Sequence, residues 1–370
     1  MNFDFSDDLK LLRDQARRFL REHSPPRAVR QVLEGEATYD DKLWTEISRM
    51  GWLGAAIPEE FGGAGLGYEG LCVLAEELGA ALAPVPVSSS IYLAGEAILL
   101  GGSDAQKQAW LPQIASGERI GTFALAEGQG NPDPARIRAT VKGGRLTGSK
   151  LPVADGEIAH LAVVVAKGPA GEVGLHLVDL TAPGVTRERL KTIDPSRNHA
   201  RLVFADAAAE PLAGAPGWGA VQTLLDRAAI LVAFEQVGGA QACLDMAKTY
   251  AMERYAFGRP IGSFQAIKHK LADIYIATEL ARSNAYYGAW AIATDAAQLP
   301  VAAAAARVSA TDAFERASKE NIQTHGGMGF TWEADCHLYY RRAKLLSLSI
   351  GSPPFWKNRL IDELELRNEP

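Results

Sequence analysis

The sequence has few of the features that mark secreted, membrane-spanning or metal-binding proteins. Only 3 of its 370 residues are cysteines, and Cys72, Cys243 and Cys336 show neither metal-ligand spacing nor a disulfide framework. We expect them to be small buried residues of a reducing compartment. The N-terminus has no apolar segment typical of a signal peptide, and the most apolar window, 91–100, is too short to span a bilayer. These absences predict a soluble cytoplasmic protein.

Positive charge is scarce as well. The 38 Lys and Arg residues are outnumbered by 44 Asp and Glu residues, which gives a net charge of −6. This balance argues against a nucleic-acid groove and against a general binder of anionic membranes. By contrast, apolar residues make up 47% of the chain, so a large core is available. The length is sufficient for two or three domains.

Helical patterns occupy the first 120 residues. An amphipathic, capped helix is predicted from residue 6 to about 23, and Pro25-Pro26 should end it. Further helical patterns cover 40–50, 68–82, 88–100 and 103–116. The glycine-rich stretch 58–65 lies between two of them. No strand precedes it and no Lys-Ser/Thr follows it, so a tight structural turn is favoured over a phosphate-binding loop.

The pattern then changes to period two. β-branched runs at 122–126, 139–141, 161–165, 174–180 and 200–204 predict strands. From 218 to about 348 the chain is helical again, with Pro300 expected to separate a helix at 264–294 from an alanine-rich one at 301–322. The order α, β, α predicts an α+β fold with a helical domain at 1–119, a β-barrel-like domain at 120–215 and a four-helix bundle at 216–370.

One corner between two of these helices gathers residues suited to a nucleotide. Three helix-breaking residues form the corner: Gly258, Pro260 and Gly262. Ser263 is expected to cap the second helix. Three further residues should cluster here: Arg254, Phe257 and Gln265. An arginine can hold a phosphate, and an aromatic side chain can lie against a flat ring. On periodicity alone, however, an ordinary helix–turn–helix with a surface arginine is the simpler interpretation.

The residue order at this corner resembles the acyl-CoA dehydrogenase family. Residues 254–273 read R-x-x-F-G-x-P-I-x-x-F-Q-x-x-x-H-x-L-A-D, and residues 323–333 read Q-T-H-G-G-M-G-F-T-W-E. The resemblance extends over nearly the whole chain, and two long ordered motifs are far more specific than a lone glycine motif. It implies an oxidoreductase and flavoprotein that uses FAD to remove hydrogens from the α and β carbons of an acyl-CoA thioester.

The resemblance also implies which residues meet the cofactor. In the family, the C-terminal bundle acts on the FAD of the neighbouring subunit. The arginine contacts the pyrophosphate, the aromatic and the first glutamine contact the adenosine side, and the second motif approaches the dinucleotide with its backbone. All of these positions carry the family residues: Arg254, Phe257, Gln265, Gln323, Gly326 and Gly327.

In the family, each subunit also contacts its own FAD, and several of the residues that do so are replaced in this sequence. In the family's T-E-P-x-x-G-S-D motif, the threonine is replaced by Ala126 and the serine by Pro132. In its K-x-W/F-I-T/S motif, the stacking aromatic is replaced by Pro152 and the hydroxyl by Ala154. About three ring contacts are thereby lost, each worth roughly 1 kcal/mol or more.

The catalytic base is missing at both positions where the family carries one. The usual glutamate position matches Ile350, and the minority position matches Ala228. Glu235 lies seven residues beyond Ala228 on the same helical face and is a possible substitute. A partly exposed or capping glutamate is the more economical interpretation, and Asp226 is similar. The sequence therefore assigns no catalytic residue.

The residues for a neighbour's FAD are retained, whereas those for the chain's own FAD and base are replaced. In this the sequence resembles the non-catalytic partner subunit of bacterial heterotetrameric acyl-CoA dehydrogenases, several of which act on CoA thioesters of steroid side chains. The expected partners are an acyl-CoA substrate and a second acyl-CoA dehydrogenase-like subunit, or another copy in a dimer or tetramer. Two alternatives stay open. One is a self-sufficient flavoenzyme with an unusual base. The other is a non-flavin binding protein of the same fold, which leaves the retained Arg254 and Gln323 unexplained.

Two histidines in the motifs raise the question of a metal. His269 and His325 have no partners at metal-ligand spacing, so no metal site is predicted and structural roles are expected. The resemblance implies that His269 packs inside the bundle.

Overall fold

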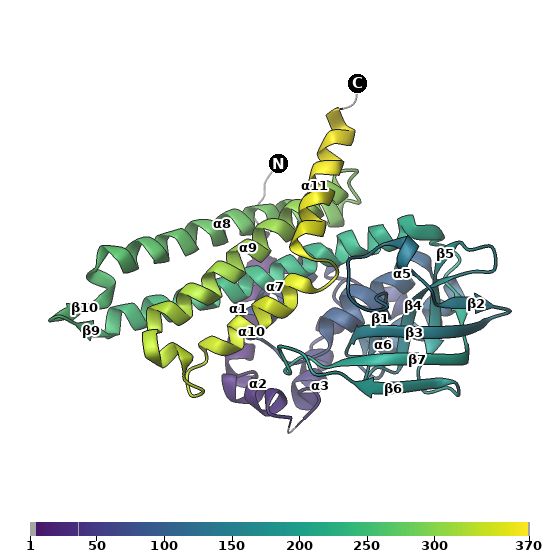
Figure 1. The fold of residues 1–370 in the computed structure, drawn as a ribbon, viewed down its shortest axis with the longest axis horizontal. Helices are drawn as coiled ribbons and strands as arrows, with labels where there is room; N and C mark the ends of the chain where they lie inside the picture. Colours follow the sequence, from purple (N-terminus) through teal and green to yellow (C-terminus); the bar gives the residue numbers. More distant parts are fainter. Residues whose placement is uncertain (1–4, 36, 369–370) are drawn as a thin grey trace. The chain divides into compact units, whose positions relative to one another are not determined.

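The computed structural model, shown in Figure 1, describes residues 5–35 and 37–368. The chain forms two compact units. Met1–Val29, Cys72–Ala83 and Ala229–Pro370 make up one, the helical unit; Arg30–Leu71 and Pro84–Ala228 make up the other, the mixed unit. The three-domain division at 119/120 and 215/216 stays a prediction. Among the described residues, no helix combines the length and apolar character needed to cross a membrane.

Polar caps fix the starts of three N-terminal helices, and the first of these caps was predicted. α1 (Asp7–His23) begins after Ser6, whose hydroxyl accepts a hydrogen bond from the Leu9 amide. Asp40 caps α3 (Asp41–Arg49) in the same way, and a capping box of Ser103 and Gln106 opens α6 (Asp104–Ala115). α4 (Gly67–Ala80) confirms the pattern at 68–82. The sequence did not predict α2 (Pro26–Leu33), because a proline that ends one helix is also tolerated in the first turn of the next.

The remaining predictions for this part of the chain hold in outline. The helical pattern at 88–100 is a π-helix, Ser88–Gly95, followed by α5 (Glu96–Gly101). The stretch 58–65 contains the short helix η2 (Glu59–Phe61) and is a tight turn. A Cβ on Gly63 would lie only 1.7 Å from the Ile57 carbonyl oxygen, so close backbone packing explains this glycine.

An eight-stranded sheet forms the centre of the mixed unit, in the order β6-β7-β3-β2-β4-β5-β8, with β1 paired to β4. Five strands confirm the predicted runs: β1 (Gly121–Ala124), β2 (Thr140–Lys142), β4 (Leu161–Lys167), β5 (Val173–Asp179) and β7 (His199–Ala208). Three strands were not predicted: β3 (Arg145–Ala154), β6 (Val185–Arg189) and β8 (Glu210–Pro211). β3 contains a glycine and a proline, and β6 is a charged edge strand, so neither shows an apolar alternation.

Long helices form the C-terminal part of the chain. They are α7 (Gly217–Glu253), α8 (Gln265–Ala293), α9 (Leu299–His325), α10 (Cys336–Leu348) and α11 (Pro353–Asn368). Two predicted boundaries were wrong. Phe264, not Ser263, occupies the N-cap of α8, because the Ser263 hydroxyl donates to the Pro260 carbonyl at 2.7 Å inside a preceding short helix. Pro300 lies within the first turn of α9 and does not precede it. The three cysteines are buried and none forms a disulfide within the described residues, as predicted.

Three histidines make the mixed unit sensitive to acid. Burial is the main cause that lowers the pKa of His160, His176 and His199. Each therefore stays neutral in the folded chain at a pH where the unfolded chain, with a pKa near 6.5, takes up a proton. The unfolded state then binds more protons, so we expect the free energy of unfolding to be at its full value above pH 6.5 and to fall as the pH drops below it.

Urea unfolding followed by circular dichroism at pH 7.5 and 5.5 measures this effect. His176→Gln is the informative variant, because its unfolding free energy should depend less on pH than that of the unmodified chain. An equal pH dependence in both proteins would contradict the role of His176.

Candidate functional site

The predicted nucleotide corner is present and exposed at one end of the helical unit. After α7 the chain forms a short hairpin, β9 (Tyr255–Ala256) paired with β10 (Arg259–Pro260), and then enters α8 (Figure 1). Phe257 lies at the hairpin tip with 96% of its surface exposed and a φ of 52°, which is unusual for an aromatic residue. Arg254 and Gln265 are exposed as well. The structure therefore places all three residues around one turn.

Arg254 is the arginine of this corner that an external anion can use. Its guanidinium forms no hydrogen bond or ion pair within residues 5–35 and 37–368. Only its backbone is engaged: the amide donates to the Tyr250 carbonyl at 2.8 Å, and the carbonyl accepts from the Ile261 amide at 2.7 Å. Arg259, by contrast, lies over the Phe264 ring at 4.1 Å. The backbone bonds hold Arg254 in place while its charge stays available.

The second motif lies beside the first. Tyr250, one helical turn before Arg254, stacks on His325 with ring centroids 4.2 Å apart. The Nδ1 atom of His325 donates to the Asn321 carbonyl at 2.8 Å, which fixes the ring at the end of α9. Gly326 follows directly. The ring stack thus brings the two sequence motifs together, and His325 has the structural role that the sequence predicted.

The glycines of the second motif differ in what they are needed for. A Cβ on Gly329 would lie 2.5 Å from the Ile322 carbonyl oxygen, so internal packing explains that glycine. Gly326 has a φ of +59°, a backbone conformation that favours glycine, so its own backbone explains this second glycine. At Gly327 φ is not positive, and a Cβ would meet no described atom within 4 Å. Gln323, one turn earlier, is exposed. The surface here is open to the close approach of another molecule.

His269 does not pack inside the bundle. It is exposed on the first turns of α8, where its Nε2 lies 3.5 Å from the Gln265 amide nitrogen. The expectation from the resemblance was wrong here, because this part of α8 presents His269 and Gln265, four residues apart, on the same exposed face.

The two depleted segments lie side by side in the mixed unit. The Leu151 amide donates to the Ala126 carbonyl at 2.8 Å, and Glu127 pairs with Leu151 in an isolated parallel bridge. The fully buried Lys150 ammonium donates to Glu127 at 2.6 Å, and burial lowers the pKa of this ammonium. The Lys150–Glu127 pair thus holds the two family motifs together even though their flavin-contacting residues have changed.

The replacements leave these segments without the side-chain groups that would hydrogen-bond or stack on a flavin ring. The side chains of Ala126, Pro152 and Ala154 contain no hydrogen-bond donor and no aromatic ring. The Ala154 carbonyl is already used, because it accepts from the Thr122 hydroxyl at 2.5 Å. Only backbone groups remain for polar contacts at these three positions.

Neither base position carries a proton acceptor. Ile350 follows α10 with a φ of 55°, a left-handed conformation that is a genuine outlier for a β-branched residue. Ala228 is completely buried in α7. Aliphatic side chains cannot remove a proton, so the structure supplies no general base at either position.

A buried arginine anchors the segment that leads to Ile350. Arg307 of α9 is 1% exposed, and it donates to the Leu346 carbonyl, to the Ser349 carbonyl at 3.0 Å and to the Gln236 side chain at 2.5 Å. Burial lowers the pKa of Arg307 to about 9, so its guanidinium stays protonated at neutral pH. The last turn of α10 is therefore fixed by charge-assisted hydrogen bonds.

Glu235 belongs to the interior of the helical unit. It is 3% exposed in the middle of α7, and a Cβ on Gly79 would lie 2.1 Å from its carbonyl oxygen. Its charge acts to raise the pKa of Arg307. The expectation of a partly exposed or capping glutamate was wrong, because α7 is packed on several sides here. The same correction applies to Asp226, which is 2% exposed in the mixed unit.

Comparisons with known proteins decide the family. Residues 6–118 match the acyl-CoA dehydrogenase N-terminal domain, and residues 215–354 match the acyl-CoA dehydrogenase C-terminal domain. The chain belongs to the acyl-CoA dehydrogenase family. Acyl-CoA dehydrogenase IpdE2 of Mycobacterium tuberculosis is 34% identical over 361 residues, which cover 97% of this chain and 98% of the relative. The predicted oxidoreductase family is thereby confirmed.

Solved structures of acyl-CoA dehydrogenases confirm the fold. A variant of the steroid acyl-CoA dehydrogenase Tcur3481-Tcur3483 is similar with a TM-score of 0.88 and 34% identity, over 98% of both chains. The ChsE4-ChsE5 complex from Mycobacterium tuberculosis is similar with a TM-score of 0.90 and 29% identity, over 100% of both chains. The predicted order of an N-terminal helical part, a central sheet and C-terminal helices is thus correct.

Proposed function

We propose that this chain is one subunit of a heteromeric acyl-CoA dehydrogenase, giving contacts to FAD in a partner's site and lacking a base of its own. One observation carries the proposal. Among the described residues, the Arg254 guanidinium has no partner and the surface at Gly326-Gly327 is open. By contrast, the side chains of Ala126, Pro152 and Ala154 offer a flavin ring neither a hydrogen bond nor aromatic stacking.

The residues at the corner fit the adenosine and pyrophosphate part of FAD. Arg254 supplies a charge that has no partner among the residues the structure describes, Phe257 supplies an exposed aromatic face, and Gln323 supplies an amide donor. The residues of the mixed unit do not fit the flavin ring, so no hydride transfer is assigned to a flavin held by the chain's own sheet. FAD, where bound, supplies the hydride acceptor; this chain's part is to bind and orient it.

Two relatives support the heteromer and a bulky acyl group. Tcur3481-Tcur3483 is a steroid acyl-CoA dehydrogenase named after two proteins, and ChsE4-ChsE5 is described as a complex. We propose by analogy a partner chain of the same family and, as substrate, the CoA thioester of a steroid-like or fatty acid. A cytoplasmic location belongs to the same proposal, because three buried free thiols suit a reducing compartment.

The visible spectrum and the mass of the purified protein test the proposal. The chain is purified alone and together with a candidate partner chain of the same family from the same organism. We expect a colourless preparation from the chain alone and a yellow complex with one FAD per pair of chains. A yellow homomer that an acyl-CoA bleaches would overturn the proposal and favour a self-sufficient enzyme.

Glu235→Gln further distinguishes a subunit without its own base from a self-sufficient enzyme that uses Glu235 as the base. If Glu235 were a catalytic base, this change would abolish acyl-CoA oxidation, typically by a factor of about 10² to 10⁴. We expect turnover of the complex to change by less than about threefold, because Glu235 is buried beside Arg307. Steady-state oxidation with an artificial electron acceptor gives the answer, and thermal unfolding of the variant shows whether any loss reflects misfolding.

A further inference from the structure

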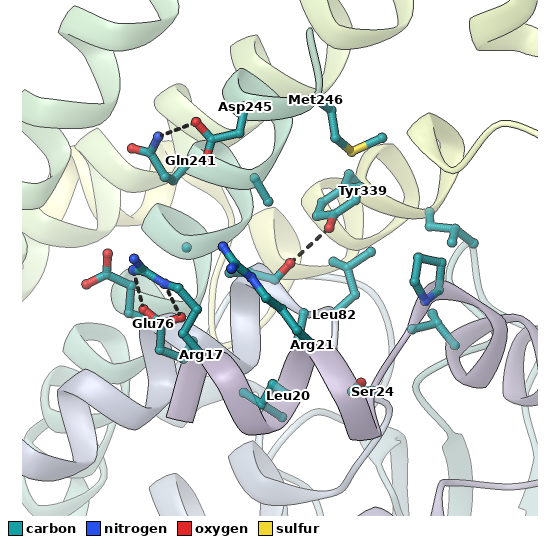
Figure 2. A pocket seen from close by; sticks show the side chains of 18 of the residues that line it. Arg17, Leu20, Arg21, Ser24, Glu76, Leu82, Gln241, Asp245, Met246 and Tyr339 are labelled. Atoms are coloured by element: carbon teal, nitrogen blue, oxygen red, sulfur yellow. Dashed lines mark hydrogen bonds and ion pairs between the residues drawn. The ribbon is translucent and has the colours of Figure 1, made fainter. Parts of the chain in front are cut away.

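A cavity of about 620 Å³ lies within the helical unit, away from the Arg254 corner. Its walls come from α1, the start of α2, the end of α4 and the second half of α7, with Arg282 of α8 and two residues of α10 (Figure 2). Met246, the lining residue of α7 closest to Arg254 in sequence, precedes it by 8 residues, or about 12 Å of helix. The volume falls in the range of small-molecule pockets, about 300–1,000 Å³.

One wall of the cavity is cationic. Arg13, Arg17 and Arg21 recur every four residues on α1 and therefore share one helical face. Figure 2 shows Arg17 and Arg21 extending from α1 toward the α7 and α10 side of the cavity. Four arginines and three acids line it: Arg13, Arg17, Arg21 and Arg282, with Glu76, Glu77 and Asp245. The lining therefore carries one positive charge in excess.

Arg13 and Arg21 are the two arginines of this wall that form no ion pair among the described residues, so their charges are left for a ligand. Arg17 donates two hydrogen bonds to Glu77, at 2.7 and 3.0 Å, and Arg282 pairs with Glu76. Arg21 forms neither a hydrogen bond nor an ion pair with any residue of the described chain. An anion that enters the cavity thus meets an arginine that need not break an existing pair.

The polar part of the wall is incomplete. The Ser24 hydroxyl, the Oε2 atom of Glu76 and the Nε atom of Arg13 are buried without a hydrogen-bond partner among the described residues. Ser24 and Glu76 are each only 4% exposed. Buried polar atoms are normally hydrogen-bonded, so three such atoms around one cavity indicate that a bound polar group belongs there.

The rest of the wall is apolar. Five side chains contribute to it: Leu20, Val29, Ala242, Met246 and Leu338. Methionine adapts its shape to irregular apolar groups, so this side of the cavity suits a hydrocarbon body of variable form. A ligand that satisfies both walls has an anionic head and an apolar body.

We propose that this cavity binds an amphipathic carboxylate, with the carboxylate on Arg21 and the apolar body against Leu20 and Met246. The carbonyl of a CoA thioester is neutral, so Arg21 would favour the free acid over the thioester group itself. The site shares no residue with the proposed FAD contacts, so either proposal can fail without the other. The ligand would make the subunit responsive to free acids of the same class as the acyl group.

Isothermal titration calorimetry on the purified chain, in whichever assembly it forms, tests the site. The probes are dodecanoate, dodecan-1-ol and dodecylammonium, which share one tail and differ in charge, each below its micelle concentration. We expect one dodecanoate per copy of this chain and at least tenfold weaker binding of the alcohol and the amine. Arg21→Gln should weaken dodecanoate binding about tenfold. Arg18→Gln, on the same helix but outside the cavity lining, should change it less than about twofold.

A second variant tests the location independently of charge. Ala242→Leu fills the cavity from α7 and should abolish dodecanoate binding while circular dichroism shows an unchanged fold. Equal losses in Arg21→Gln and Arg18→Gln, equal affinity for the alcohol, or full dodecanoate binding in Ala242→Leu would each overturn the proposal.

Discussion

Arg254→Ala is expected to release FAD from the proposed heteromeric complex. The guanidinium has no partner among the described residues, so its removal should cost the fold little, whereas a charge-assisted contact to a pyrophosphate is worth about 1.5–3 kcal/mol. The dissociation constant for FAD should therefore rise about 10- to 100-fold. Flavin absorbance per pair of chains after gel filtration, and fluorescence titration of the stripped complex, measure the effect.

Lys248→Ala provides the matched control for Arg254→Ala. Lys248 is an exposed cation on α7, 6 residues before Arg254, and it belongs to neither motif. We expect its FAD content to equal that of the unmodified complex. If both variants lost FAD to the same extent, the loss would reflect general electrostatics and not a specific contact by Arg254. If neither lost FAD, the proposed contact in trans would be wrong.

Arg307→Met is expected to have the largest effect on stability. Methionine approaches the length of the arginine but leaves the carbonyls of Leu346 and Ser349 and the Gln236 amide oxygen without their charged donor. Removing one member of a buried charged network typically costs about 3–5 kcal/mol. Chemical denaturation followed by tryptophan fluorescence should show this decrease in the free energy of unfolding.

Arg316→Met on the same helix serves as the control for Arg307→Met. Its side chain is 56% exposed, and its ion pair with Asp273 spans 4.0 Å. Exposed pairs contribute little, so a change within about 0.5 kcal/mol is expected. A similar decrease in both variants would show that the loss comes from helix α9 as a whole and not from the buried network.

The sequence by itself determined the family and most of the helices. Local chemistry sets these features: a capping serine or aspartate before α1, α3 and α6, and glycine and proline between α7 and α8. It also showed that Ile350 and Ala228 cannot act as bases, because the side chain alone decides that question. Strand β3 escaped prediction because its Lys150 is buried and its Pro152 breaks the pattern, and only pairing with β7 and β2 makes it a strand.

Only the tertiary structure decided how these residues are used. The stack of Tyr250 on His325 joins two motifs that are about 70 residues apart in sequence, and no local pattern encodes a contact at that range. The structure likewise showed that Glu235 is buried, whereas the Arg254 side chain has no partner in the part of the chain that the structure describes. Burial and pairing depend on which segments pack together, so a cavity lined by α1, α4, α7 and α10 could be found only after the chain had folded.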